Sequence, residues 1–381
     1  MHRLLFGIVA IGLVLSIYFG FCYYIFLRGW QALPKISLLR SLYIAIFLLL
    51  VLSFFAGMIF EHQLPFKVSG DLQVIGVSWM ISMVYIFIFL IFFDLLRLAN
   101  HFWGIFPAII TAHYLKVKIM AFIIVLASII IAFFIGYLRF SNPQTTVLQL
   151  SIPKHAGELK ELKIAVASDL HLGDVVRKER LKKFVGKIEG LHPDMILLAG
   201  DVIDRNIKPV VQQNMSEELR KLKAPLGVYA ITGNHEHYGN VEKSCAYLQQ
   251  SGVTVLRDTA IKIKNSLYLI GRDDLSNKHR QSLHHLTENL DPALPLILLD
   301  HQPRNLKEAI SNHIDLQLSG HTHDGQVWPF NLIIHSIYED GYGYLRKDNT
   351  QFYVTSGLGL WGAPFRIGTK SEVVLIKLRF K

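Results

Sequence analysis

Two kinds of apolar pattern divide this chain near residue 140. Before that point, long apolar runs with few charges cover residues 4–27, 38–60, 72–98 and 119–138. Each run is long enough to cross a hydrocarbon layer of roughly 30 Å, which takes about 20 helical residues. We therefore expect four transmembrane helices. The first is not expected to be a cleaved signal peptide, because its apolar run is too long and no small-residue cleavage pattern follows it.

Two features of this region are expected at or near the membrane surface. The stretch 103–115 is too short to span a bilayer, and we expect it in the interface, with Trp103 and Tyr114 at headgroup level. Asp94 and Arg97 lie one helical turn apart near the end of the third run. Charges inside a membrane can mark a transport path, but a position near the interface favours a pair that reaches the headgroups.

After residue 140 the apolar runs are short and rich in β-branched and aliphatic residues, a pattern typical of buried strands. Five runs are followed directly by polar clusters: KIAVAS, MILLAG, VYAITG, LPLILLD and LQLSG. Residues just past the carboxyl ends of strands lie in the crevice where open sheets bind ligands. We expect these strands to bring together the clusters at 168–171, 200–201, 233–236, 301 and 320–323.

The segments between and after these strands predict the remaining elements. Apolar residues at helical spacing predict helices over 180–191 and 241–250. Later apolar runs at 260–264, 266–270, 351–357 and 372–380 are expected to form a second sheet. Two sheets with helices outside them agree with this order of elements.

The clustered side chains predict a site for two divalent metal ions. Asp, His and Asn together offer hard oxygens and imidazole nitrogens, a mixture suited to Mn²⁺, Fe or Zn²⁺. Two ions roughly 3.5–4 Å apart need a bridging ligand, and Asp201 is the candidate bridge. The other ligands divide into two sets. One set is Asp169, His171 and His323, the other is Asn234, His301 and His321, and His235 is left free for chemistry.

Taken singly, such residues have a simpler explanation. A histidine at a strand end is more often a hydrogen-bonded residue than a ligand, and Asp or Asn in a turn usually stabilises the turn. The joint order of the clusters favours a metal site, since each follows an apolar strand and several are flanked by glycine. Gly200, Gly233 and Gly320 permit sharp turns at these points.

The order Asp-x-His, Gly-Asp, Gly-Asn-His-Glu, His, Gly-His-x-His resembles the calcineurin-like metallophosphoesterases, over about residues 162–377. SDLHLG, the triplet HQP at 301–303 and SGLGLWGAPFRIGT are most similar to the bacterial membrane-anchored branch, which includes transmembrane proteins with a metallophosphoesterase domain. The resemblance implies an α/β protein with a four-layer α/β/β/α sandwich. Asp324 departs from that branch, which more often has glycine there, and would add a carboxylate at the rim of the site.

The resemblance also implies a metal-dependent phosphoric ester hydrolase, with Mn²⁺ as the favoured metal. We expect a metal-bridging hydroxide to attack a phosphodiester or pyrophosphate. His235 is expected to contact the phosphate and to help the leaving oxygen depart. Asp204 and Glu236 are candidates for groups that orient ligand imidazoles, and a helix-capping role is equally open for either.

The distribution of charged residues along the chain indicates which kind of partner it binds. The formal net charge is +10; residues 1–140 hold nine Lys or Arg against three Asp or Glu, and the remainder holds 30 against 26. More than half of the excess therefore lies where cations meet anionic lipid, which favours a bilayer over nucleic acid as the partner. Cys22 and Cys245 fall in different regions, and no disulfide is expected between them.

We expect a membrane domain with four transmembrane helices at 1–138, a linker at 139–149 and a metallophosphoesterase domain at 150–381. The linker is expected because RFSNPQTTVLQ is polar and contains Pro143. Its shortness keeps the enzyme domain close to the bilayer.

Lysine and arginine near the helix ends predict the orientation of this multi-pass cell-membrane protein. The first and third loops carry six of them: Arg28, Lys35, Arg40, Arg97, Lys116 and Lys118. The other side carries four: Arg3, Lys67, Arg139 and Lys154. The positive-inside rule then favours cytoplasmic first and third loops and a catalytic domain outside the cytoplasm.

Proximity to the bilayer favours a lipid-linked or cell-envelope phosphate ester as substrate. Apolar residues at 327–330, with Trp361, Pro364 and Phe365, could form a rim that admits an acyl chain, although packing under their own loops is the commoner arrangement. The family-based alternative is a UDP-2,3-diacylglucosamine-type pyrophosphohydrolase of lipid A synthesis, which requires a cytoplasmic site.

Two further classes are less favoured. A non-catalytic membrane sensor or scaffold that retains a metal site is one, and the intact His235 argues against it. A nuclease or cyclic-nucleotide phosphodiesterase is the other, and the weak positive charge of the soluble half argues against that.

Overall fold

The computed structural model describes residues 2–60 and 63–381, in two compact units, Met1–Phe134 and Ile135–Lys381. Residues 1, 61 and 62, which belong to the expected membrane domain, lie outside the described residues.

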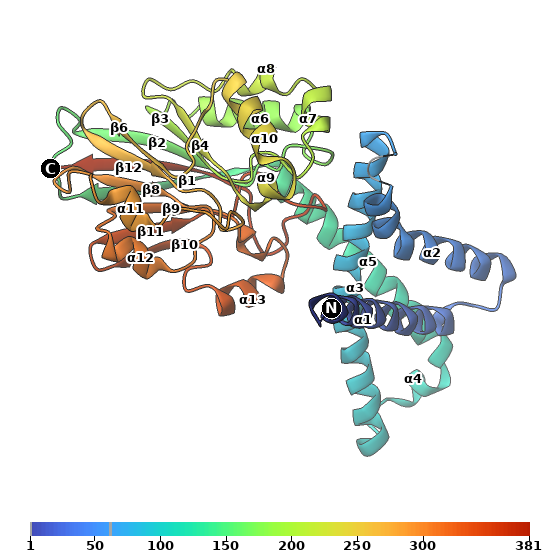
Figure 1. The fold of residues 1–381 in the computed structure, drawn as a ribbon. Helices are drawn as coiled ribbons and strands as arrows, with labels where there is room; N and C mark the ends of the chain where they lie inside the picture. The colour runs from blue at the N-terminus through green and yellow to red at the C-terminus, as the bar shows by residue number, and fades with distance from the viewer. Residues whose placement is uncertain (1, 61–62) are drawn as a thin grey trace. The chain divides into compact units, whose positions relative to one another are not determined.

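The first unit is helical. Its elements are α1 (His2–Ala32), α2 (Ser37–Ile59), α3 (Phe66–Trp103), α4 (Ala108–Ala112) and most of α5 (Tyr114–Ser141) (Figure 1). Among the described residues, four helices are long and apolar enough to cross a membrane: Val9–Ala32, Ser37–Ile59, Phe66–Trp103 and Tyr114–Ser141. The prediction of four long apolar helices before the second unit is confirmed.

The structure shows how the stretch 103–115 and the charged residue Asp94 are arranged in this unit. The stretch expected at the interface, 103–115, contains the short helix α4 between the end of α3 at Trp103 and the start of α5 at Tyr114, and Trp103 is exposed. Asp94, near the end of α3, pairs with Arg97 at 3.1 Å and also with Arg28 of α1 at 2.7 Å. The second partner gives the carboxylate two cations, which supports an ion pair that holds α1 against α3 rather than a charge left unpaired.

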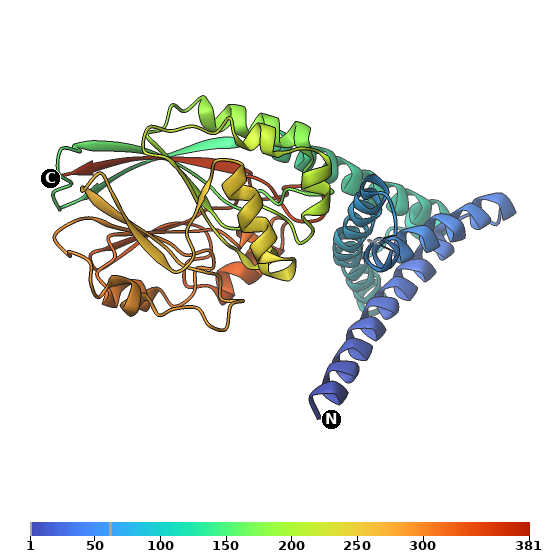
Figure 2. The same cartoon turned by 45° about the horizontal axis from the view of Figure 1, so that its top comes forward.

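The second unit is built around two six-stranded sheets (Figures 1 and 2). Its strands are β1 (Gln144–Ile152), β2 (Glu161–Ala167), β3 (Met195–Ala199), β4 (Val228–Ile231), β5 (Thr254–Val255), β6 (Thr259–Ile263), β7 (Leu267–Gly271), β8 (Leu296–Leu299), β9 (Leu316–Ser319), β10 (Gly343–Lys347), β11 (Thr350–Val354) and β12 (Glu372–Phe380). Its helices are α6 (Lys178–Glu189), α7 (Lys208–Gln212), α8 (Ser216–Leu219), α9 (Asn234–Tyr238), α10 (Val241–Gln250), α11 (Leu283–Thr287), α12 (Leu306–Ser311), the 3₁₀ turn η1 (His323–Gly325) and α13 (Phe330–Ile337).

The two sheets have related strand orders. The first runs β1-β12-β2-β3-β4-β5 and is parallel except where β12 pairs antiparallel with β2. The second runs β10-β11-β9-β8-β7-β6, with β11, β9, β8 and β7 parallel and an antiparallel strand at each end. Each sheet therefore has a parallel centre whose carboxyl ends face one edge.

Alternation along the strands creates the four layers. In β3, Leu197 belongs to the core between the sheets, whereas Ile196 and Leu198 pack with Phe184 of α6 outside them. The second sheet repeats this pattern, with one face of β8 in the central core and the other against α11 and α12. Both faces of each central strand are thus covered, which explains its continuous apolar run. Figure 2 shows the green to yellow helices over one sheet and the orange helices over the other. The predicted four-layer α/β/β/α sandwich is confirmed.

Two details of the sheets differ from expectation. The five strands that precede the polar clusters do not share one sheet, since β2, β3 and β4 lie in the first and β8 and β9 in the second. Residues 372–380, expected in the second sheet, form β12 of the first. A strand that is buried on both faces has no pattern that distinguishes one sheet from the other, so only the pairing with β1 and β2 decides its place.

The expected linker at 139–149 is also ordered in the structure. α5 continues to Ser141, and β1 begins at Gln144 and pairs in parallel with β12 over nine residues. The segment resembles a linker in its sequence because β1 is half exposed, with Thr145 and Thr146 near its start and Gln149 and Ser151 between its apolar residues.

Candidate metal centre

The loops after three strands of the first sheet carry four of the candidate ligands. Asp169 and His171 follow β2, Asp201 follows β3, and Asn234 begins α9 after β4. Asp169, His171 and Asp201 have φ angles of 56°, 48° and 50°, left-handed values that residues with a side chain seldom adopt. Such backbone strain persists only where the surroundings hold it, and it is concentrated at functional sites.

The second sheet contributes the remaining three ligands. His301 follows β8, and His321 and His323 follow β9. His321 and His323 also have positive φ angles, 72° and 51°. The carboxyl ends of the parallel strands in both sheets therefore supply the site from two sides.

The first group of side chains surrounds His171 and His323. Their Nε2 atoms are 3.1 Å apart, and Asp169 Oδ1 lies 3.4 Å from His323 Nε2 and 3.9 Å from His171 Nε2. Asp201 Oδ2 lies 3.8 Å from His171 Nε2 and 3.2 Å from His301 Nε2. One carboxylate oxygen of Asp201 is thus near both groups, the position that a bridging ligand requires.

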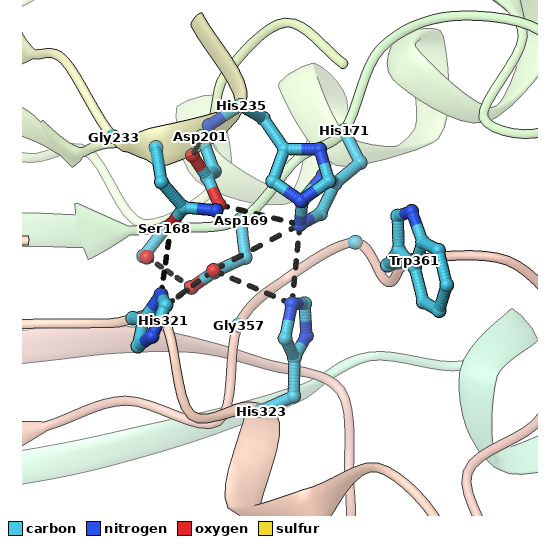
Figure 3. A network of polar contacts seen from close by, with 12 residues as sticks. Ser168, Asp169, His171, Asp201, Gly233, His235, His321, His323, Gly357 and Trp361 are labelled. Atoms are coloured by element: carbon cyan, nitrogen blue, oxygen red, sulfur yellow. Dashed lines mark hydrogen bonds and ion pairs between the residues drawn. The ribbon is translucent and has the colours of Figure 1, made fainter. Parts of the chain in front are cut away.

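The second group meets the first at Asp201. Ligand atoms of Asp201, His301 and His321 all lie within 4.8 Å of one another, and Asn234 Oδ1 is 2.8 Å from His321 Nδ1. Figure 3 shows Asp169, Asp201, His171, His321 and His323 directed toward a common centre. The seven side chains proposed as ligands are therefore brought together.

The hydrogen bonds of His301 show that a cation fits this centre. Its Nδ1 donates to the carbonyl of Ala199 at 2.8 Å, so Nε2 faces Asp201, and this buried nitrogen has no hydrogen-bond partner. A lone pair aimed at a carboxylate needs a proton or a metal ion between them. Burial lowers the pKa of His301, but the charge of Asp201 outweighs it and raises that pKa well above its usual value. The space between His301 Nε2 and Asp201 therefore favours a positive charge.

Three other imidazoles are kept neutral, the form in which histidine binds metal. Burial lowers the pKa of both His171 and His321 to about 4, and it holds the pKa of His323 well below the usual range. Burial also raises the pKa of Asp169 to about 6, aided by the charge of Asp201. Removal from water therefore disfavours charge on isolated side chains here, and a divalent cation would offset that cost.

His235 stands beside the centre, held by Asp204. Its Nδ1 donates to Asp204 Oδ1 at 2.6 Å, and its backbone N–H donates to Asp201 Oδ1 at 2.9 Å. Burial opposes a charged imidazole, but the hydrogen bond to Asp204 outweighs it and raises the pKa of His235. With Nδ1 occupied, Nε2 is the nitrogen available to a substrate. Asp204 therefore orients His235, and its Oδ1 also lies 4.0 Å from His171 Nδ1.

The carboxylate of Glu236 accepts hydrogen bonds from backbone N–H groups rather than from an imidazole. Its carboxylate accepts from the N–H groups of Asp201 at 3.2 Å, Ile203 at 2.8 Å and Gly233 at 2.7 Å. Burial raises the pKa of Glu236 to about 7. Of the two roles considered for this residue, the geometry favours the cap of α9, with the loop after β3 held as well.

Arg366 is a residue of this site to which the sequence assigned no role. Its side chain is fully buried and donates to the carbonyls of His323 at 2.8 Å, Gly357 at 3.3 Å and Gly359 at 2.6 Å. It thereby ties the ligand loop after β9 to the loop before β12. The signal in the sequence was a lone arginine within the apolar tail SGLGLWGAPFRIGT, where a charge needs a buried partner.

Residues at the rim range from buried to exposed, and Pro329, Phe330, Pro364 and Phe365 are intermediate. Asp324 is buried and accepts from His335 Nε2 at 3.1 Å, so its carboxylate has a partner outside the ligand cluster. Val327 packs inside, as the commoner arrangement would have it, but Trp328 and Trp361 are 43% and 40% exposed. Figure 3 places Trp361 on the side of the centre where His171 and His323 lie.

Two glycines allow the loops to approach this closely. A Cβ at Gly320 would collide with Ser168 Oγ and Asp169 Oδ2. Gly200 has φ of 90°, and a Cβ there would strike the ring of His301. Both positions therefore require glycine for the ligands to converge.

Known proteins resemble this chain over part of its length. The family model described as "Calcineurin-like phosphoesterase" matches residues 162–325. An uncharacterized metallophosphoesterase of Aquifex aeolicus is 35% identical over 58% of this chain and 86% of its own length. One from Helicobacter pylori is 34% identical over 58% of this chain. A transmembrane protein with metallophosphoesterase domain from Danio rerio is 30% identical over 62% of this chain and 57% of its own length. The chain spans 60% of the length of that Helicobacter pylori relative.

Proposed function

Because this chain belongs to the calcineurin-like phosphoesterase family, we propose that it is a membrane-bound hydrolase that cleaves a phosphodiester or pyrophosphate bond. The observation that best supports this is the meeting of two ligand groups at Asp201, which lies 3.8 Å from His171 Nε2 and 3.2 Å from His301 Nε2. Membership of this family and the side-chain cluster both support metal-dependent hydrolysis of a phosphate ester.

The residues that would hold the metals are Asp169, His171 and His323 on one side, Asn234, His301 and His321 on the other, and Asp201 between them. When bound, two divalent ions supply Lewis-acid charge that orients a phosphate and activates a water molecule. Neutral imidazoles with hard oxygens suit Mn²⁺, Fe or Zn²⁺, and we favour Mn²⁺.

His235 would act on the substrate itself. Asp204 fixes Nδ1 of this imidazole, so that Nε2 carries the proton that can be donated to the leaving oxygen or to a phosphate oxygen. The hydrogen bond to Asp204 raises the pKa of His235, which favours the protonated imidazole. A covalent intermediate is unnecessary in this scheme, since each proposed residue binds, orients or donates a proton.

The membrane location follows from the four long apolar helices. We propose that the catalytic unit lies outside the cytoplasm, on the count of six against four Lys and Arg near the helix ends. Labelling of Val211→Cys, an exposed position on α7, with an impermeant maleimide on spheroplasts tests this orientation. Labelling only after lysis would place the unit in the cytoplasm and favour the UDP-2,3-diacylglucosamine-type pyrophosphohydrolase instead.

A lipid-linked or cell-envelope phosphate ester is the proposed substrate class, because the catalytic unit follows α5 without a free linker. The test is turnover of bis(p-nitrophenyl) phosphate by the full chain purified in detergent, with its metal content measured. We expect turnover that a chelator removes and Mn²⁺ restores. Two bound metal ions without turnover of any lipid, nucleotide or chromogenic ester would instead favour a non-catalytic sensor or scaffold.

A further inference from the structure

Five large apolar side chains form an exposed surface beside the metal centre, termed here the rim surface. Its members are Trp328, Leu332, Ile333, Ile337 and Trp361, which are 43%, 59%, 50%, 62% and 40% exposed. Four of them lie within the ten residues that include α13. Single exposed apolar residues are ordinary, but such a concentration on one short helix and its neighbouring loop marks an interaction surface.

The rim surface is fastened to the metal centre at both ends of α13. Before the helix, the η1 turn contains the proposed ligand His323. After the helix, the ring of Tyr338 lies edge-on to His321, with 6.3 Å between ring centroids. Tyr338 also accepts a hydrogen bond from the exposed Arg304 at 3.3 Å. Whatever binds the rim surface is therefore brought next to the catalytic groups and to a cation suited to an anionic headgroup.

The loop that carries Trp361 is joined to the start of this segment. The side chain of Gln326 donates to the carbonyl of Trp361 at 2.9 Å and accepts from its N–H at 3.2 Å. The N–H of Trp328 donates to the carbonyl of Ile367 at 2.7 Å. These bonds hold the two tryptophans on connected loops, so the rim surface is a fixed part of the second unit.

The end of a candidate membrane span adjoins these same loops within the second unit. Residues 135–141 are the last turns of the span Tyr114–Ser141 and belong to this unit. The carbonyl of Gly136 accepts from the N–H of Arg366 at 3.0 Å, and a Cβ at Gly136 would lie 2.8 Å from Ile367. The neighbouring Tyr137 and Leu138 are 44% and 43% exposed. The exposed apolar side chains at the end of the span therefore lie next to the loop that contains Ile367, which binds the backbone of Trp328.

We propose that the rim surface docks into the interface of the lipid bilayer and presents the metal centre to a phosphate ester whose apolar part stays in the lipid. This inference rests on the proposed function for its substrate, but the docking itself does not. Leucine and isoleucine on one face of a surface helix, flanked by tryptophan, are the side chains that enter the headgroup region. Continuity with the end of α5 selects the bilayer over a soluble protein as the occupant.

Docking is tested on the full chain in phosphatidylethanolamine/phosphatidylglycerol vesicles. Ile333→Cys and the control Val211→Cys, both exposed positions, are made in a Cys22→Ala, Cys245→Ala background and labelled with bimane. At position 333 we expect at least threefold stronger quenching by nitroxide-labelled lipid than at 211, and at least threefold weaker quenching by aqueous iodide. Iodide quenching equal at both positions would overturn the proposal. A label shielded from both quenchers would also overturn it, because the chain's own helices or a second copy would then cover α13.

A second measurement does not require the cysteine background. Ile333→Asp with Ile337→Asp should lower turnover of a dioleoyl p-nitrophenyl phosphodiester in vesicles at least tenfold, and alter turnover of soluble bis(p-nitrophenyl) phosphate less than twofold. Equal losses on both substrates would contradict docking. If the unaltered chain hydrolyses neither substrate, the proposed function fails, and the quenching result still decides the docking surface.

Discussion

His235 donates from Nδ1 to Asp204 Oδ1 over 2.6 Å, and neither residue is among the seven proposed metal ligands. We predict that His235→Ala lowers kcat about 100-fold or more, because a positioned proton donor typically contributes that much. Bound metal, measured by mass spectrometry, should be unchanged. His285→Ala, an exposed histidine paired with Glu288, is the control. Unchanged turnover in His235→Ala would remove it from the reaction.

Asp273 gives a prediction for the pH dependence of stability. Its buried carboxylate accepts from His237 at 2.8 Å and from Arg257 at 2.9 Å. Burial would raise its pKa, but the bonds from His237, Thr232 and Arg257 outweigh it and hold the pKa of Asp273 far below its usual range. A depressed carboxyl pKa contributes stability that is present above the unfolded value of about 3.9 and is lost as pH falls toward the folded pKa.

Asp273→Asn should therefore destabilise the second unit by about 3 kcal/mol at pH 7, since it removes the buried carboxylate to which His237 and the partly buried Arg257 donate. The corresponding drop in Tm is about 6–12 °C, and the difference in Tm from the unaltered chain should narrow as pH falls below about 4. Arg257 also binds the exposed Glu242 at 2.8 Å, so Glu242→Gln is the matched control, with less than about 1 kcal/mol expected. Thermal unfolding in detergent from about pH 2 to pH 7 measures both variants. Equal drops in Tm for the two variants would refute the assignment.

The close contacts of Gly320 lead to a prediction about the spacing between the loops after β2 and β9. Gly320→Ala puts a methyl group onto Ser168 Oγ and Asp169 Oδ2, so we expect at least one metal ion to be lost and Tm to fall. Gly186→Ala on α6, where a Cβ meets nothing within 4 Å, should instead raise stability by roughly 0.5–1 kcal/mol. Full metal content in Gly320→Ala would show that the loops after β2 and β9 can move apart.

We predict that Arg366 supports metal binding because it holds the backbone of the proposed ligand His323. Arg366→Met removes the donor that holds the carbonyl of His323 at 2.8 Å, and supporting groups of this kind typically contribute 10- to 100-fold in metal affinity, so we expect a loss of about that size. Arg379→Met is the control, because the side chain of Arg379 is 71% exposed and pairs with the exposed Glu161. Competition with a chelator gives the affinity. An Arg366→Met chain with unaltered affinity would limit the residue to packing.

Local patterns were enough to predict much of this molecule. Strand ends followed by Asp, His and Asn predicted which side chains lie close together, because that inference needs only the direction of each strand. Long apolar runs predicted the four helices, since their length is set by bilayer thickness. The helices near 180 and 241 were predicted within two residues of α6 and α10.

The features that the sequence did not predict depend on contacts between segments that are separated along the chain. β12 pairs with β1 and β2, and no local signal in residues 372–380 separates that choice from the second sheet. The role of Arg366 is invisible for the same reason, since its acceptors lie 7 to 43 residues away. The exposure of Leu332, Ile333 and Ile337 on α13 also escapes prediction, because an apolar helical run is ordinarily buried.

The central claim is that two metal ions share Asp201 at the edge where the sheets meet. Anomalous diffraction from crystals of the full chain grown with Mn²⁺ tests it most directly. We predict two peaks about 3.5–4 Å apart, both in contact with Asp201, and loss of both peaks in Asp201→Ala. A single peak away from Asp201, or none among Asp169, His301 and His323, would contradict the account.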